Sequence, residues 1–392
     1  MSASVASPQR VAGGVDIGTV LEVVRGHMGE TDEAARFPIE ALRAMRESGL
    51  LGMLVPAEYG GAGLGIPDML DVTSSIAREC MSAAMVFAMH QQQVFTLCRF
   101  ARPHTRAALL PRVARGELYL ASVTTEAGTG GRLLSAQAAL SARDERLAID
   151  RFAPIVTGGA HADGFLITMR APGARTDNEV SLVYADRADL ATAPSGAWNP
   201  MGMRATDSRP MRLTGSVPES NVIGGHGRFR HITVTTFGPL AHLGWSASWL
   251  GTAAGALERV VRFLRSPEER ARRKLDSELL LGRLSAARQA IDTVNALLQH
   301  ATQVFLSGRD LSTPSCQLLF NALKLTASER CLAAVDELIE LLGLRHGYLR
   351  DSPLRLERAW RDLRSASLNY ANDRLRMADG TLTLMDSEVH LA

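Results

Sequence analysis

LYLASVTT (Leu118–Thr125) interrupts a chain that is otherwise patterned for helices, and this interruption decides the fold class. The run contains β-branched and aromatic residues, and helical periodicity fades here. Three similar runs follow, separated by Gly, Pro, Asp and Asn: FLITMR (Phe165–Arg170), VSLVYA (Val180–Ala185) and HITVTTF (His231–Phe237). Short strands with such residues between them are typical of a small antiparallel sheet or barrel. We therefore predict a central β domain over residues 119–235.

The sequence before this region predicts helices. In FPIEALRAMRESGLLG (Phe37–Gly52), apolar residues recur at helical spacing and Gly49 predicts the helix end. After a loop rich in Gly and Pro, a long helical pattern runs from position 68 to about position 101. We predict an N-terminal helical domain over residues 16–118. Residues 1–15 lack the apolar core of a signal peptide, so we expect a flexible terminus there.

Helical spacing returns after the β region and lasts to about Met377. It is interrupted at Ser266-Pro267, Thr313-Pro314 and Ser352-Pro353, which predicts four long helices. We assign residues 236–392 to a C-terminal helical bundle. This order of helices, strands and a helical bundle differs from the alternation of strands and helices in α/β enzymes. The expected fold is therefore α+β, mainly α.

The composition limits the partners of the chain. Hydrophobic residues make up 46% of the 392 residues and the formal net charge is +2, which favours a sizeable core and no polyanionic or membrane-surface partner. Almost all positive charge is arginine, because lysine occurs only at Lys274 and Lys324. The four cysteines have no zinc-like spacing, and no run of about 18 apolar residues is present. We expect a cytoplasmic protein without a metal site, binding neither nucleic acid nor membrane.

Six segments carry further information. They are GLLGMLVPAEYGGAGLG (Gly49–Gly65), SVTTEAGTGG (Ser122–Gly131), VTGGAHADGFLI (Val156–Ile167), MGMRATDSRPMRL with VPESNVIG (Met201–Gly224), WLGTAAGALE (Trp249–Glu258), and HGYLRDSP with AWRDLR (His346–Arg364). In order and spacing they resemble the signature segments of the acyl-CoA dehydrogenase superfamily over nearly the full chain. The resemblance implies that family's fold, a flavin cofactor (FAD first, or FMN) and a homo-oligomer, either a dimer or a tetramer.

The resemblance also implies which residues hold the flavin. Thr157 lies six residues before Asp163, as the flavin-facing hydroxyl residue of the family does, and the resemblance implies that its hydroxyl could donate to flavin N5. Ile155 stands where members often have a tryptophan over the ring. The alternative is that the threonines are ordinary strand residues. By position, the cofactor-binding residues are Val123, Thr124, Thr125, Gly130, Gly131, Ile155 and Thr157.

The catalytic base of the family is missing. Dehydrogenation of an acyl thioester needs a base within reach of the α-proton. The family places a glutamate nine residues after the arginine of its RD motif, and counting from Arg361 gives Tyr370. Other members place it ten residues before the glycine of the first bundle helix. Counting back from Gly251 gives Ala241, followed by His242. Tyrosine, with an ordinary pKa of about 10, is a poor base at neutral pH.

Other departures point toward one branch of the superfamily. RSPEERARR (Arg265–Arg273) lacks the Phe-Gly pair that helps members clamp a neighbouring subunit's FAD, and Gly131-Arg132 replaces a serine-aspartate pair. Flavin-dependent monooxygenases of the superfamily lack these features too. They use O2 and reduced flavin, often supplied by a partner reductase. Asn369, Tyr370 and Asn372 would then line the reaction chamber and act by hydrogen bonds. Alternatively, Asn369 and Tyr370 merely end a helix.

Four residues are the candidates for substrate contacts. His90 and Gln93 belong to the polar run HQQQ in an apolar helix, which borders the substrate cavity in the family. Exposure to solvent or a subunit contact is the alternative for this run. His242 and Trp245 lie on the first bundle helix, where core packing is the alternative.

Three functions remain open from the sequence. The favoured one is a monooxygenase or oxidase that uses reduced flavin and O2 on a specialised-metabolism substrate. The second is an FAD-dependent dehydrogenase of an acyl thioester on CoA or a carrier protein. The third is a non-redox protein that has lost flavin.

Overall fold

A computed structural model describes residues 15–128 and 132–392, so residues 1–14, Gly130 and Gly131 lie outside the described residues. Two compact units make up the described chain. The first comprises residues 15–72, 86–198 (apart from 129–131) and 205–237, and the second comprises 73–85, 199–204 and 238–392. The order of elements is helical, then β, then helical, which confirms the predicted α+β, mainly α class.

The N-terminal region is helical, as predicted. Gly49 follows the second helix in the left-handed conformation, with φ of +77°, which confirms the predicted helix end. The long helical pattern after the loop is divided at Cys80, although helical backbone bonds continue on both sides of this residue. The helices are α1 (Ile17–Ala34), α2 (Ile39–Glu47), α3 (Ile66–Glu79), α4 (Met81–Phe100) and α5 (Pro103–Ala114), with 3-10 turns at Leu50–Gly52 and Ala57–Tyr59.

The β region contains two four-stranded sheets, ordered β1-β4-β5-β8 and β2-β3-β7-β6 within the described residues. The runs LYLASVTT, FLITMR and VSLVYA form β1, β4 and β5, as predicted. β1 pairs with β4 in parallel, and the other named strand pairs are antiparallel. The strands are β1 (Leu120–Val123), β2 (Ser141–Arg143), β3 (Arg146–Val156), β4 (Gly164–Arg170), β5 (Val180–Asp186), β6 (Leu190–Pro194), β7 (Arg209–Pro218) and β8 (Val222–Ile223).

The prediction of a strand for HITVTTF was wrong. This run forms the short helix α6 (Phe229–Ile232) and a π-helical turn at Thr233–Phe237, which continues into the next helix. The buried residues of the run do not alternate, as they would in a half-buried strand. Thr235 Oγ1 donates to His231 O over 2.7 Å, a bond along the helix that β-branched residues can make. Tertiary burial thus overrides strand propensity here.

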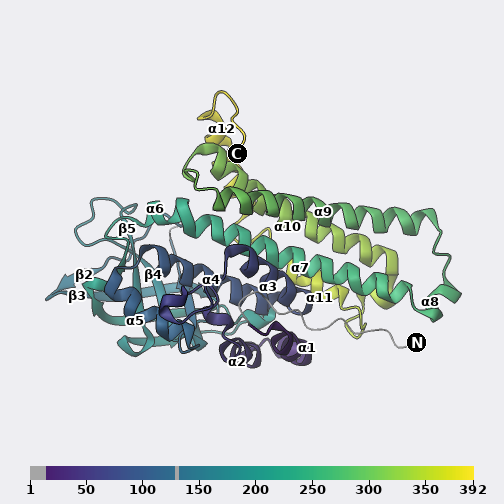
Figure 1. Ribbon diagram of the computed structural model, residues 1–392, viewed down its shortest axis with the longest axis horizontal. Helices are drawn as coiled ribbons and strands as arrows, with labels where there is room; N and C mark the ends of the chain where they lie inside the picture. Colours follow the sequence, from purple (N-terminus) through teal and green to yellow (C-terminus); the bar gives the residue numbers. More distant parts are fainter. Residues whose placement is uncertain (1–14, 129–131) are drawn as a thin grey trace. The chain divides into compact units, whose positions relative to one another are not determined.

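Three long helices dominate the described C-terminal region and lie alongside one another in Figure 1. The expected fourth long helix is instead divided into two short helices by a turn at residues 365–371. Two of the predicted breaks are N-caps, where Ser266 and Thr313 accept backbone N–H groups just before a proline. The elements are α7 (Gly238–Leu264), α8 (Pro267–Arg272), α9 (Glu278–Leu306), α10 (Pro314–Gly343), a π-helical turn at Leu344–Tyr348, α11 (Leu356–Arg364) and α12 (Asn372–Leu384).

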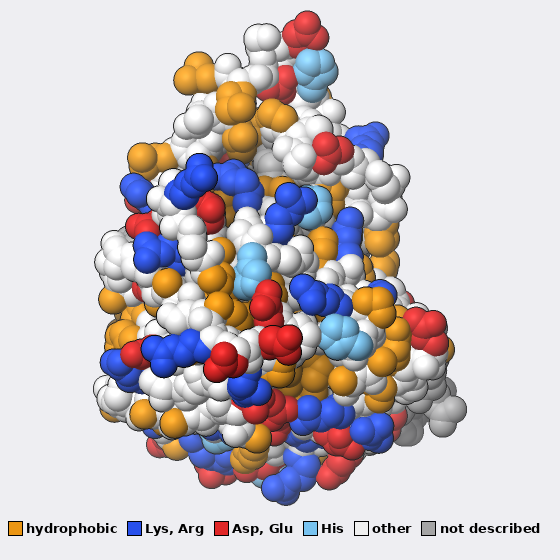
Figure 2. Space-filling view, turned by 90° about the vertical axis from the view of Figure 1, so that its left-hand side faces the viewer, with side chains coloured by type: hydrophobic (Ala, Val, Ile, Leu, Met, Phe, Trp, Pro, Cys, Tyr) orange, Lys and Arg blue, Asp and Glu red, His pale blue; other side chains and the backbone are white. Residues whose placement is uncertain are grey.

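The surface carries both signs of charge. On the face drawn in Figure 2, basic and acidic side chains are interspersed among apolar ones. This mixture accords with the small net charge of the chain. None of the helices in the described ranges is long and apolar enough to cross a membrane.

Candidate functional site

The segment after β1 is fastened to two neighbouring strands. Thr125 Oγ1 donates to Ile155 O over 2.8 Å and accepts from Ile155 N over 3.3 Å. Val123 O accepts a bond from Thr168 Oγ1 over 3.3 Å. Strands β3 and β4 therefore hold Val123, Thr124 and Thr125, which are predicted to bind the flavin. A cofactor site needs rigid support of this kind.

A buried ion pair supports the same segment. Arg151 on β3 is almost fully buried, contacts Glu126 over 2.9 Å and donates to Thr125 O over 2.8 Å. Burial lowers the pKa of Arg151, and Glu126 opposes that shift. Glu126 also accepts the backbone N–H groups of residues 137 and 138. Sequence reasoning missed Arg151. Its signal was an arginine in the middle of an otherwise alternating strand.

Ile155 and Thr157 lie at the end of β3 and just after it. Ile155 has 48% of its surface exposed, so its apolar side chain is open to contact. The half-buried Thr157 hydroxyl lies 3.0 Å from Ser208 Oγ, and Ser208 Oγ donates to Thr206 Oγ1 over 2.9 Å. Because the single proton of Ser208 goes to Thr206 in this arrangement, Thr157 donates to Ser208 and keeps lone pairs for a further donor, unlike the expected donation from Thr157 to a flavin. Thr206 and Ser208 belong to MGMRATDSRPMRL, which was the signal for them.

These residues fit one face of a flavin ring. An exposed aliphatic side chain offers apolar surface for a planar ring, and the adjacent Thr157 oxygen can accept a hydrogen bond at its edge. The first unit thus brings together Val123, Thr124, Thr125, Ile155 and Thr157. Gly130 and Gly131 lie outside the described residues.

His90 bridges two parts of the first unit. Its Nε2 lies 2.9 Å from Leu51 O, and its Nδ1 accepts from Leu120 N over 3.0 Å. Complete burial lowers the pKa of His90 to about 4, against an opposing effect of Leu51 O and with a further lowering by Arg46. The ring is therefore neutral, with Nε2 protonated. Both nitrogens are engaged by backbone groups, so His90 attaches β1 to the N-terminal helical region.

The glutamines beside His90 are buried, and solvent exposure of this run is excluded. Gln91 Nε2 donates to Leu50 O over 2.8 Å, and Gln92 Nε2 donates to Phe237 O over 2.6 Å. Gln93 Nε2 donates to Met89 O and to Gln92 Oε1. The Oε1 atoms of Gln91 and Gln93 have no hydrogen-bond partner within the described part of the chain. Either acceptor could be satisfied by a donor group of a bound molecule.

In the second unit, α7 carries a row of aromatic side chains. His242 Nδ1 lies 3.0 Å from Phe320 O, and burial lowers the pKa of His242 to about 4, with Lys324 acting in the same direction. The neutral ring donates through Nδ1, which leaves a lone pair on Nε2. The Trp245 ring lies 5.8 Å from His242 and 6.4 Å from Trp249. Both indole N–H groups are buried without a partner among the described residues.

Sequence reasoning did not identify Lys324 on α10 as a site residue. Its side chain is fully buried, and Nζ donates to Asn372 Oδ1 over 2.6 Å and to Tyr370 O over 3.1 Å. The ammonium group lies 5.8 Å from the centre of the Trp249 ring. Burial lowers the pKa of Lys324 to about 8, while Glu329 opposes the shift. The signal was the rarity of lysine: in a chain that otherwise uses arginine, one of two lysines lies on an apolar helix.

Tyr370 lies in the turn between α11 and α12. Its φ of +51° is left-handed, an uncommon conformation for a bulky residue. It keeps 37% of its surface exposed, yet burial raises the pKa of the phenol above its ordinary value, against the effect of Arg374. Asn369 is exposed beside it. Lys324 holds the Tyr370 carbonyl and so stabilises this backbone conformation.

Asn372 is buried rather than open to a chamber. Its amide donates to Ser328 Oγ and to Glu329 Oε1, each over 3.0 Å, and its oxygen accepts from Lys324. All of its polar groups face neighbouring helices. Asn372 therefore positions the turn, whereas Asn369 and Tyr370 remain available for contacts.

The segment around Met201 is joined to the RD motif within the second unit. Met203 N donates to Asp362 Oδ1 over 2.6 Å, and Arg361 donates to Met201 O over 2.9 Å. A Cβ atom on Gly202 would lie 2.0 Å from Arg361 O, so only glycine permits this approach. These contacts hold α11, the helix that carries Arg361 and Asp362. Tyr370 lies nine residues after Arg361, in the turn that follows this helix.

Comparisons with known proteins agree with this architecture. Residues 19–117 match the family "Acyl-CoA dehydrogenase, N-terminal domain", and residues 243–373 match "Acyl-CoA dehydrogenase, C-terminal domain". The chain is 23% identical to cyclohex-1-ene-1-carbonyl-CoA dehydrogenase of Syntrophus aciditrophicus, over 91% of this chain and 85% of that protein. It is 25% identical to an L-prolyl-[peptidyl-carrier protein] dehydrogenase of Pseudomonas fluorescens, over 76% of this chain and 78% of that protein.

Among solved structures, the fold is similar to that of FMN-bound TdsC from Paenibacillus sp. A11-2, with a TM-score of 0.84 and 21% identity, over 94% of this chain and 96% of that one. TdsC is described as a dibenzothiophene monooxygenase. The two family matches lie on either side of the β region and together span more than half of the chain. The chain belongs to the acyl-CoA dehydrogenase superfamily, whose members are flavin-dependent oxidoreductases.

Proposed function

We propose that this protein is a flavin-dependent monooxygenase or oxidase that uses reduced flavin and O2 on a small specialised-metabolism substrate. The observation that carries the proposal is Tyr370 at the position of the family's glutamate. Burial raises the pKa of its phenol, so the hydroxyl stays protonated at neutral pH. A protonated phenol can donate a hydrogen bond but cannot remove an α-proton.

The residues proposed to hold the flavin lie in the first unit. Backbone groups of Val123, Thr124 and Thr125 would bind the pyrimidine end, and Ile155 would cover the ring. The Thr157 oxygen can accept a hydrogen bond, which suits the protonated N5 of a reduced flavin better than the unprotonated N5 of an oxidised one. Reaction of the reduced ring with O2 is the chemistry that the bound cofactor would supply.

The residues proposed to act on oxygen and substrate lie in the second unit. The Tyr370 hydroxyl and the Asn369 amide would donate hydrogen bonds to an oxygen atom that gains negative charge. Neutral His242, with a lone pair on Nε2, would accept a proton from a substrate hydroxyl or amine. Lys324 and Asn372 would hold the turn that presents Tyr370.

FAD and FMN are both candidates. The missing Phe-Gly pair and the similarity to FMN-bound TdsC make FMN the first to test. A partner flavin reductase would supply the reduced form. We also propose a homodimer or homotetramer, as implied by the family. Sedimentation of the purified chain as a monomer at micromolar concentration would contradict that part of the proposal.

One observation favours a second candidate, the dehydrogenation of an acyl thioester. His242 follows Ala241, the position that corresponds to the alternative glutamate of the family, and its Nε2 lone pair could serve as the base. Both named sequence relatives are thioester dehydrogenases.

Anaerobic mixing separates the two functions. Protein loaded with oxidised FAD or FMN is mixed without O2 with a panel of acyl-CoA and acyl-pantetheine thioesters. We expect the yellow absorbance near 450 nm, typical of oxidised flavin, to persist for minutes. Bleaching within seconds would overturn the monooxygenase proposal in favour of the dehydrogenase. Failure to bind flavin in either redox state would overturn both.

A further inference from the structure

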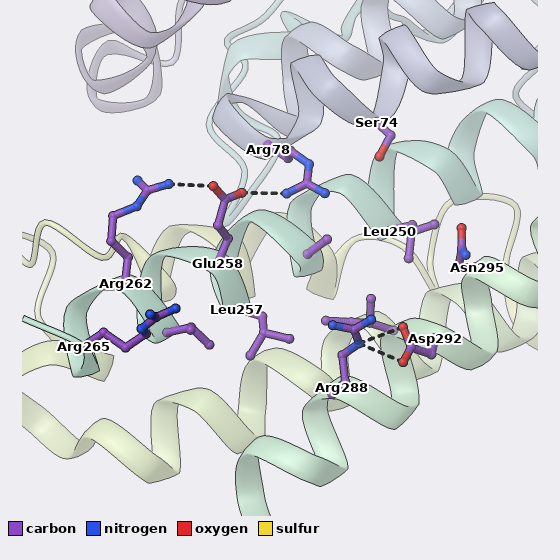
Figure 3. Close-up of a pocket in the computed structure, with 13 residues that line it drawn as sticks. Ser74, Arg78, Leu250, Leu257, Glu258, Arg262, Arg265, Arg288, Asp292 and Asn295 are labelled. Atoms are coloured by element: carbon purple, nitrogen blue, oxygen red, sulfur yellow. Dashed lines mark hydrogen bonds and ion pairs between the residues drawn. The ribbon is translucent and has the colours of Figure 1, made fainter. Parts of the chain in front are cut away.

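A hollow of about 790 Å³ lies within the second unit, between three helices (Figure 3). The lining side chains on α7 recur every three or four residues, as do those on α9, so one stripe of each helix faces the same space. The lining residues are Ser74 and Arg78 of α3; Leu250, Ala254, Leu257, Glu258, Val261 and Arg262 of α7; Arg265, just after the end of α7; and Arg288, Ile291, Asp292 and Asn295 of α9. We call this space the arginine hollow.

Helix packing keeps the hollow open. Gly251 and Gly255 bring α7 against the backbone of α3, where a Cβ on Gly251 would lie 2.2 Å from Ser74 O. This close approach fixes the distance between the two helices. Ser74 and Ala254 are too small to fill the space beside it. The hollow is therefore a consequence of rigid packing and not of a loop that could collapse.

The floor and the rim of the hollow differ in chemistry. Leu250 and Ile291 are buried at its floor, together with Leu257 of intermediate exposure. The rim carries four arginines against two carboxylates, a formal excess of two positive charges (4 − 2). An apolar floor with a charged rim is the arrangement of a binding site for amphipathic small molecules, whose pockets usually measure about 300–1,000 Å³.

The arginines are unequally paired. Glu258 contacts Arg78 over 2.7 Å and Arg262 over 2.6 Å, so one carboxylate neutralises only one of these two cations. Arg288 binds Asp292 with two hydrogen bonds, of 2.9 and 2.8 Å, which completes a neutral pair. Arg265 makes no ion pair with any described residue, and Figure 3 shows it at the same end of the hollow as Arg262. The unbalanced positive charge therefore gathers around Arg262 and Arg265.

We propose that the arginine hollow binds an organic anion with an apolar body, such as an aryl or acyl carboxylate, sulfonate or phosphate ester. The apolar body would lie over Leu250, Leu257 and Ile291. The anionic group would accept hydrogen bonds from Arg265 and Arg262, because guanidinium groups match planar and tetrahedral oxyanions. This site goes beyond the proposed flavin reaction. On α7 it uses another face than the one that carries His242, Trp245 and Trp249.

The probe for this site is 8-anilinonaphthalene-1-sulfonate, whose fluorescence rises in apolar surroundings. N-phenyl-1-naphthylamine has the same rings without the sulfonate and reports on the floor alone. In Arg265→Ala, we expect sulfonate affinity to fall about tenfold, the scale of one lost hydrogen bond to a charged group. Affinity for the neutral probe should stay within about twofold because the floor is unchanged. Dodecanoate and dodecyl phosphate should displace the sulfonate, and inorganic phosphate should not.

Two further variants make the test decisive. Ala254→Phe places a bulky ring in the hollow beside its apolar floor and should weaken binding of both probes by at least about tenfold. Arg270→Ala, on α8 outside the hollow, removes an exposed arginine as a matched control and should change neither affinity. Equal sulfonate affinity in all three variants would overturn the proposal, because the probe would then bind elsewhere. A change of oligomeric state in Ala254→Phe, measured by sedimentation, would also overturn it and assign the hollow to a contact between copies.

Discussion

Thr157 is the residue proposed to distinguish reduced flavin from oxidised flavin. Its proton goes to Ser208, so its oxygen is left as an acceptor. In Thr157→Val, which keeps the shape, we expect affinity for reduced flavin to fall about tenfold and affinity for oxidised flavin to change less. Anaerobic titration with both forms measures this difference, and Thr157→Ser should retain it. Unchanged affinity in the valine variant would remove Thr157 from the site.

Tyr370 is the residue that separates the two reaction types. Its hydroxyl is proposed to donate a hydrogen bond, so Tyr370→Phe should slow turnover by about tenfold or more. Tyr348 is a matched control, because it is an exposed tyrosine in the same unit. Steady-state rates of O2 consumption with reduced flavin are measured for Tyr370→Phe and for the control Tyr348→Phe. If Tyr370→Phe retains the full rate, the side chain only fills space.

At the scale of elements, Lys324 joins α10 to the turn before α12. Its folded pKa of about 8 lies below the ordinary value of 10.5, so the unfolded chain binds more protons between these values. This group therefore makes the protein more stable as pH rises from about 8 toward 10.5, by at most about 3 kcal/mol in total. Urea unfolding of wild type and Lys324→Met at pH 7.5, 9 and 10 should show this slope in the wild type alone. An equal change of stability with pH in wild type and Lys324→Met would contradict this prediction.

His90 joins β1 to the helical region, and its protonation should loosen that contact. The folded pKa of about 4 is below the ordinary 6.5, so its contribution is present above pH 6.5 and is lost as pH falls toward 4. We expect His90→Gln to lower stability at pH 8 by about 2 kcal/mol and to flatten the acid slope. His104→Gln, at an exposed histidine, is the control. Thermal unfolding from pH 4.5 to 8 measures both, and an unaltered acid slope would contradict this role.

The elements that sequence patterns predicted are those whose local and tertiary preferences agree. FLITMR and VSLVYA are β-prone and buried, and they are the strands β4 and β5. HITVTTF is equally β-prone, but its position before α7 buries it as a helix. The turn at residues 365–371 could not be predicted, since a left-handed tyrosine depends on a lysine some 46 residues away in sequence. Contacts of that kind are absent from any local pattern.

The candidate site was predictable only where a motif carries its residues. Val123, Thr124, Thr125 and Thr157 stand at motif positions, and the structure brings their supports together. Lys324 and Arg151 belong to no motif, and their burial follows from packing. For the HQQQ run, the alternative of solvent exposure was wrong, because side-chain amides can satisfy distant backbone carbonyls inside a protein.

At the scale of the whole molecule, superfamily membership establishes flavin chemistry but leaves the reaction open, because one fold serves several reactions. Loss of the carboxylate at Tyr370 and the acceptor oxygen of Thr157 both favour an enzyme that takes up flavin already reduced. A dehydrogenase would instead hold oxidised FAD tightly and receive its electrons from the thioester. The two alternatives therefore differ in which redox state of the flavin binds better.

The measurement that tests this claim most directly is an anaerobic titration of the purified protein with FMN and FAD, each oxidised and reduced, followed by admission of O2. We predict that the reduced form binds at least about tenfold more tightly, a difference of about 1.4 kcal/mol. The bound reduced flavin should then be oxidised by O2 on the protein. Tight binding of oxidised FAD, with no preference for the reduced form, would contradict the account.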